Sequence, residues 1–162
     1  WCVDALSTVG AAAGKAGLRL AIEPLNRYET DFVNTVRQGV ELVQRIDQAS
    51  VGLTLDTFHM NMEEDDLCDA IRIAGRHLTH FQANENHRGY LGTGHLHWTS
   101  VVRALEAADY RGAITLEPFR RRDDRIGVTF AQWRPPSQDE AAEYRASCAM
   151  IRTLIALNGS RQ

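Results

Sequence analysis

Four short apolar runs, each ending at a polar residue, constrain the fold of this 162-residue chain more than any other feature. The runs begin at residues 18, 51, 78 and 112, and segments with helical spacing lie before, between and after them. This alternation is typical of a parallel sheet covered by helices. The sequence therefore predicts an α/β fold in which one helix precedes four βα units.

The helical segments are recognised by their spacing and by their end signals. Between Val36 and Ile46, apolar residues recur every three or four positions, which indicates an amphipathic helix, and Asn34 or Thr35 is suited to its N-cap. We predict a loop directly after the second strand, where His59 lies, and loops over 85–95 and 120–137, the last of which opens with three arginines. We expect helices over 3–15, 34–48, 66–75, 98–109 and 138–157, and strands over 18–22, 51–56, 78–82 and 112–116.

Composition excludes several classes of protein. The net charge of -3 gives no electrostatic basis for binding nucleic acid or an anionic membrane. Three scattered cysteines form no CxxC pair, which favours a reducing, cytoplasmic setting over a disulfide framework. No apolar run reaches 18 residues, and we expect neither a membrane span nor a signal peptide. Because the chain opens on Trp1 rather than Met, we expect it to be part of a longer protein.

The polar residues at the four strand ends form the main candidate site. They are Glu23, Asp56, Gln82 and Glu117. The carboxyl ends of parallel strands lie at one rim, where α/β enzymes place their catalytic groups. Three carboxylates and one amide oxygen suit a hard divalent cation, and without a cation the carboxylates would raise each other's pKa. The pattern predicts a metal site at this rim.

Four segments carry a resemblance to a known family. They are IEPLNRYE (22–29), LTLDTFHMNMEE (53–64), HFQANENHRGYLGTGH (80–95) and ITLEPF (114–119). In order and spacing they resemble the sugar isomerase/epimerase family with a xylose isomerase-like TIM barrel, and most closely the ketose 3-epimerases of the D-tagatose/D-psicose type. The resemblance implies that residues 1–162 form one domain. It would be the C-terminal half of a (β/α)₈ TIM barrel, with strands five to eight.

The resemblance also implies roles for individual residues. Glu23 and Glu117 would bind the metal and act as the acid/base pair, whereas Asp56 would be a ligand only. Gln82 occupies a ligand position that is often His in the family. The implied cofactor is a divalent metal, Mn²⁺ first and Mg²⁺ or Co²⁺ next. The implied substrate is a small sugar, and its oxygens would be held by Glu29, His59 and Arg88.

Alternatives remain open at this stage. Each of these residues could serve a structural role, as a strand-end cap or a surface ion pair, and His59 could also be a metal ligand. The reaction could instead be that of a hydroxypyruvate isomerase, a polyol dehydratase or a metal-dependent nuclease of the same fold, and the chain could be a non-catalytic half barrel. Two open sheet edges are expected in a half barrel. We expect truncation to account for them, ahead of pairing in a homo-oligomer or a second chain.

Overall fold

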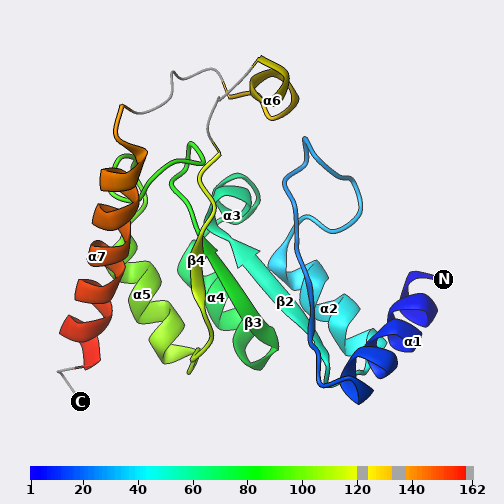
Figure 1. The fold of residues 1–162 in the computed structure, drawn as a ribbon. Helices are drawn as coiled ribbons and strands as arrows, with labels where there is room; N and C mark the ends of the chain where they lie inside the picture. The colour runs from blue at the N-terminus through cyan, green and yellow to red at the C-terminus, as the bar shows by residue number, and fades with distance from the viewer. Residues whose placement is uncertain (120–123, 133–137, 160–162) are drawn as a thin grey trace.

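The computed structural model describes residues 1–119, 124–132 and 138–159. Twelve elements follow one another in these ranges, and Figure 1 shows their arrangement around one sheet. The strands are β1 (Leu20–Ile22), β2 (Val51–Asp56), β3 (Leu78–Ala83) and β4 (Ile114–Leu116). The helices are α1 (Cys2–Lys15), α2 (Val36–Ile46), α3 (Thr57–Glu63), α4 (Leu67–Ala74), the 3₁₀ helix η1 (Gly75–His77), α5 (Trp98–Ala107), α6 (Asp124–Thr129) and α7 (Glu140–Gly159).

The sheet has the order β1-β2-β3-β4, and every neighbouring pair is parallel. The predicted α/β class and the four parallel strands are therefore confirmed. Ile22 pairs with Leu53, Asp56 with Gln82, and Gln82 with Thr115. This register brings the carboxyl ends of all four strands to one edge of the sheet.

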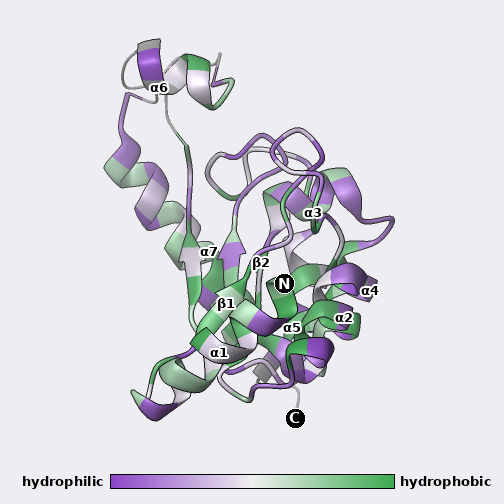
Figure 2. Ribbon diagram, turned by 90° about the vertical axis from the view of Figure 1, so that its right-hand side faces the viewer, coloured by the Kyte–Doolittle hydropathy of each residue, from purple (hydrophilic) through white to green (hydrophobic). Residues whose placement is uncertain are grey.

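The larger helices cover one side of the sheet (Figure 1). They pack against one another in the order α1, α2, α4, α5, α7. Leu53 is fully buried beneath α2, where its side chain approaches Gly39. Since side chains alternate along a strand, Thr54 and Asp56 face the opposite side, which is the interior side of a barrel. Figure 2 shows hydrophobic residues along the strands and on the adjoining helices.

Local sequence signals account for most element boundaries. Thr35 is the N-cap of α2, and with Gln38 it forms a capping box, which satisfies backbone N–H groups at the start of the helix. Asp66 caps α4 in the same way by accepting a hydrogen bond from the Asp69 backbone. Within the described part of the chain, no helix is both long enough and apolar enough to cross a membrane.

Two expectations about local structure are wrong. The segment that carries His59 is expected to be a loop but forms α3, because the Asp56 carboxylate accepts the Phe58 N–H at 2.9 Å and so caps a new helix. The segment 120–137 is also expected to be a loop, and within it Asp124–Thr129 forms α6. Residues 120–123 and 133–137, including the three arginines at its start, lie outside the described residues.

We expect Gly52→Ala to destabilise the fold by about 1 to 3 kcal/mol, as overpacking does in a well-packed core. A Cβ at Gly52 would lie 2.7 Å from the His77 carbonyl oxygen and would overlap the Thr79 side chain. Gly14→Ala is a matched control, since its Cβ would meet Ser50 only at ordinary contact distance (3.4 Å). Urea denaturation of both variants measures the difference. Equal stability of the two would contradict the close approach of β2 and β3.

Candidate active site

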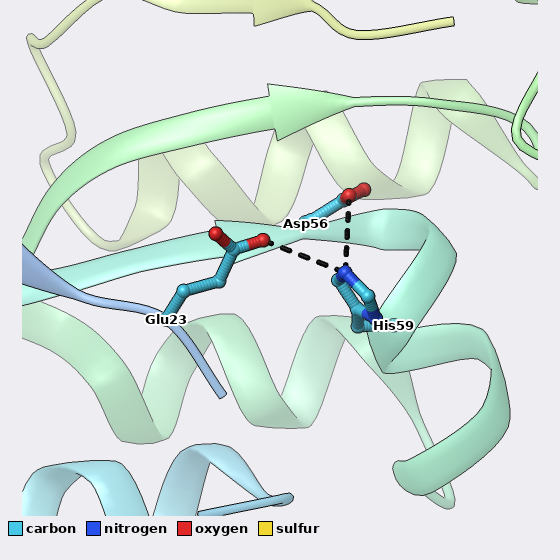
Figure 3. Close-up of side chains that lie close together, drawn as sticks. All are labelled: Glu23, Asp56 and His59. Carbon is cyan, nitrogen blue, oxygen red and sulfur yellow. Dashed lines mark ion pairs between the residues drawn. The ribbon is translucent and has the colours of Figure 1, made fainter. Parts of the chain in front are cut away.

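Three side chains from different elements converge above the strand ends (Figure 3). Glu23 directly follows β1, Asp56 ends β2, and His59 lies in α3. His59 Nε2 lies 3.6 Å from Glu23 Oε1 and 3.8 Å from Asp56 Oδ2. One potential ligand atom from each residue lies within 4.8 Å of the other two. The structure thus brings together two predicted metal ligands and one residue predicted to hold substrate.

The two carboxylate oxygens of Asp56 have different environments. Oδ1 accepts hydrogen bonds from the Phe58 backbone and from Asn84 Nδ2, both at 2.9 Å. Oδ2 is buried and has no hydrogen-bond partner among the described residues. An unpaired buried carboxylate oxygen is costly. The Asp56 side chain is held rigidly through one oxygen while the other stays available to a ligand.

The hydrogen bonds of His59 define its tautomer. Its Nδ1 accepts a hydrogen bond from the backbone N–H of Asn26 at 3.2 Å and lies 2.8 Å from Asn26 Nδ2. A backbone N–H can only donate, so Nδ1 is the acceptor and the proton of the neutral ring is on Nε2. Nε2 is buried without a hydrogen-bond partner in the described part of the chain. His59 therefore presents a hydrogen-bond donor to the space between the two carboxylates.

Gln82 and Glu117 complete the predicted set of strand-end residues. Gln82 is paired with Asp56 in the sheet, and its Oε1 is another buried atom that lacks a partner among the described residues. Glu117 follows β4, and its backbone N–H donates to Asn84 Oδ1 at 3.0 Å. Asn84 thereby ties the end of β2 to the end of β4. The charge of Glu117 also raises the pKa values of Glu23 and Asp56, which places its carboxylate near both.

Arg88 and Glu29 are the two remaining predicted residues, and Arg88 joins Glu29 to this centre. Its Nη1 donates to Glu29 Oε1 at 3.2 Å, and its Nη2 lies 3.5 Å from Glu117 Oε2. Arg88 is buried, with 6% of its surface exposed. Glu29 in turn accepts from Asn26 Nδ2 at 2.9 Å.

Burial and mutual repulsion shift the titration of the centre. Desolvation, followed by the charges of Asp56 and Glu117, raises the pKa of Glu23 to about 7. Desolvation likewise raises the pKa of Asp56 to about 6. Burial, and then the positive charge of Arg88, lowers the pKa of His59 to about 4. At neutral pH the imidazole is uncharged, and the charge of Arg88 lowers the pKa values of Glu23 and Asp56 without cancelling their rise.

We expect the His59 ring to stay neutral and Nε2-protonated between pH 5 and 8. Burial opposes the charged form, and Asn26 occupies Nδ1 as a donor. Long-range ¹H–¹⁵N NMR of the imidazole nitrogens, with the His59→Gln variant for assignment, measures both the tautomer and the titration. A midpoint near the ordinary His value of about 6.5 would contradict the buried environment.

Sequence reasoning missed two asparagines of the site. Asn26 positions His59 and Glu29, and Asn84 positions Asp56 and Glu117. Asn84 follows Gln82 by two positions, and this alternation was the available signal. Below the strand-end residues, the His80 ring is hydrogen-bonded to the hydroxyls of Thr54 (2.8 Å) and Thr115 (3.1 Å). His80 therefore links three strands, as a packed residue rather than a ligand in the described structure.

Comparison with known proteins identifies the family. The model of the xylose isomerase-like TIM barrel family matches residues 1–154. The chain belongs to this family. The resemblance noted in the sequence is thereby confirmed, and the four-stranded sheet is part of such a barrel.

Relatives within this family include sugar epimerases. The chain is 39% identical to a D-psicose 3-epimerase of Agrobacterium fabrum, over 82% of this chain and 46% of the relative. It is 37% identical to an L-ribulose 3-epimerase of a Methylomonas species, over 82% of this chain and 47% of the relative. A crystal structure of D-psicose 3-epimerase with D-tagatose from Clostridium cellulolyticum superposes with a TM-score of 0.89 at 34% identity, covering 94% of this chain and 55% of the other. The chain spans about half the length of the relatives it matches.

Proposed function

We propose that this chain carries the catalytic centre of a metal-dependent sugar epimerase that inverts C3 of a free ketose. The observation that carries the proposal is the group of Glu23, Asp56, Gln82 and Glu117 at the ends of four adjacent parallel strands. The similarity to D-psicose and L-ribulose 3-epimerases supports the choice of reaction.

The donor set fits a divalent cation. Asp56 Oδ2 and Gln82 Oε1 are buried without hydrogen-bond partners among the described residues, and the pKa of Glu23 is raised by burial and by neighbouring negative charge. A cation at this centre would offset both costs. We propose that Glu23, Asp56, Gln82 and Glu117 hold it. Because oxygen ligands favour hard cations, Mn²⁺ is our first choice, followed by Mg²⁺ and Co²⁺.

His59 is better suited to the substrate than to the metal. Its Nε2 carries a proton, because Nδ1 accepts from the Asn26 backbone, and a protonated ring nitrogen cannot ligate a cation. We propose that His59 Nε2–H donates to a substrate oxygen. Arg88 would do the same, and Glu29 would accept from a substrate hydroxyl.

We propose that Glu23 and Glu117 exchange a proton on either side of one carbon. They follow the first and last strands of the sheet, with Asp56 and Gln82 between them. Inversion at C3 requires removal of the C3 proton by one carboxylate and return of a proton to the opposite face from the other. Removal leaves a negatively charged enediolate, and a bound divalent cation would supply electrostatic stabilisation for that charge.

A complete barrel requires more than these four strands. A (β/α)₈ barrel closes with eight strands, and the chain spans about half the length of its relatives. We propose that β1 to β4 correspond to strands five to eight, the C-terminal half, with the other half supplied by polypeptide beyond residues 1–162. Intact-mass measurement of the natural protein tests this, because a polypeptide near the mass of this chain alone would contradict it.

Turnover of a substrate series tests the proposed reaction. The metal-stripped protein is reloaded with Mn²⁺, Mg²⁺ or Co²⁺ and offered D-fructose, D-tagatose, L-ribulose and hydroxypyruvate. We expect formation of the C3 epimer of at least one ketose, which EDTA abolishes and the cation restores. Turnover of hydroxypyruvate alone would favour the isomerase alternative, and no turnover by the metal-loaded complete protein would contradict catalysis.

A further inference from the structure

The guanidinium group of Arg88 lies against two aromatic rings. Its central carbon is 3.7 Å from the ring centroid of Phe119 and 4.6 Å from that of Phe58. Both distances are well inside the limit of about 6 Å for a cation–π interaction. The Arg88 side chain is only 7% exposed, so these contacts are largely desolvated and correspondingly strong.

The polar contacts of Arg88 are long for hydrogen bonds. Its distances to Glu29 (3.2 Å) and Glu117 (3.5 Å) are at or beyond the usual range for hydrogen bonds to nitrogen. Its Nε is buried and has no hydrogen-bond partner within the described ranges. The two rings therefore contribute, together with the two carboxylates, to the position of the guanidinium group.

Phe119 is connected to Arg88 through its backbone as well as its ring. Its N–H donates to the Arg88 carbonyl oxygen at 3.0 Å. Arg88 has a φ of +58°, a left-handed conformation that is uncommon outside glycine, and its N–H donates to the Glu85 carbonyl at 2.7 Å. Phe119, which follows β4, thus contacts both the backbone of Arg88, through a hydrogen bond, and its guanidinium group, through the ring.

We propose that Phe119, assisted by Phe58, is a positioning residue that holds the Arg88 guanidinium between Glu29 and Glu117. The position of the guanidinium group bears on activity through the proposed function, in which Arg88 donates to a substrate oxygen.

The chemistry of the guanidinium group makes the proposal specific to arginine. Its planar, weakly hydrated surface stacks on aromatic faces, whereas a lysine ammonium is compact and strongly hydrated. Arg88→Lys should therefore retain the charge but lose most of the dependence on the rings. If Phe119 acts only by packing, its replacement should lower kcat/KM by the same factor whether residue 88 is arginine or lysine.

A double-mutant cycle tests this dependence. Phe119→Leu should lower kcat/KM about 5- to 30-fold, the range expected for a desolvated cation–π contact. In the Arg88→Lys background, Phe119→Leu should lower kcat/KM by less than about twofold. With Arg88 in place, Phe119→Tyr should keep most of the activity, because the aromatic ring is retained. Equal factors in the two backgrounds would overturn the proposal.

NMR supplies a readout that requires no turnover. The Arg88 Nε–H signal, assigned by its loss in Arg88→Lys, should be shifted upfield by the ring currents of Phe119 and Phe58. Phe119→Leu should move it toward the ordinary arginine position, whereas Phe32→Leu, at an exposed aromatic, should leave it unchanged. An Arg88 signal unaffected by Phe119→Leu would overturn the proposal even if the protein proved inactive on every ketose.

Discussion

Glu23→Gln and Glu117→Gln should each reduce kcat for ketose epimerisation by about 10²- to 10⁴-fold, the range for loss of a general acid or base. Each change removes a proton carrier, and glutamine keeps the size and one oxygen of the side chain. Initial rates with saturating substrate and cation measure the loss. The two variants should lose kcat by a similar factor, because inversion needs both a proton acceptor and a proton donor.

Two controls distinguish loss of an acid/base group from a general effect of a Glu→Gln change and from loss of the cation. Glu41→Gln, on the exposed side of α2, should retain wild-type activity. Cation content, measured on each purified variant, shows whether the loss reflects chemistry or metal binding. If either variant kept near-native turnover with its cation bound, that glutamate would not belong to the acid/base pair.

In the absence of a cation, Glu23→Gln should stabilise the protein at pH 8 by about 1 to 2 kcal/mol. The pKa of Glu23 is raised from 4.5 to about 7 in the folded state, mainly by desolvation. A pKa that is higher by one in the folded state than in the unfolded chain corresponds to about 1.4 kcal/mol, and we reduce the total because the Glu23 side chain is partly solvent-exposed. The neutral amide is not subject to this cost.

The sign of the effect follows from proton binding. Between pH 4.5 and about 7 the folded protein retains a proton on Glu23 that the unfolded chain has released, so the Glu23 contribution to stability falls as pH rises through this range. At pH 4 both states are protonated, and the variant should gain nothing. Urea denaturation in EDTA at pH 4 and pH 8 measures the difference, and an equal gain at both values would contradict it. Saturating Mn²⁺ should reverse the order at pH 8, since the wild type binds the cation more tightly.

Much of the fold follows from signals within short segments of the sequence. The alternation of apolar runs with amphipathic helices, and the caps at Thr35 and Asp66, depend on neighbouring residues. The placement of Glu23, Asp56 and Glu117 near one another follows from the rule that parallel strands share their carboxyl edge. These features could be predicted because each depends on periodicity or on strand direction alone.

The contacts across the site could not be predicted from sequence in this way. The tautomer of His59 depends on the Asn26 backbone, 33 positions away, and the environment of Arg88 depends on Phe119 after another strand. Such contacts depend on side chains that meet only after the sheet has formed, and no local pattern indicates them. Helix α3 was missed for a different reason, because it is short and Asp56 both ends β2 and caps α3.

Hydrogen exchange at C3 of the substrate tests the central claim most directly. The metal-loaded protein is incubated in D₂O with the ketose it turns over best, the cation is removed, and the sugars are analysed by NMR. We predict deuterium at C3 in the epimeric product, lost in Glu23→Gln and in Glu117→Gln. Epimerisation without deuterium at C3, or deuterium at C1 or C2 with formation of an aldose, would contradict proton exchange at C3 by this pair of glutamates.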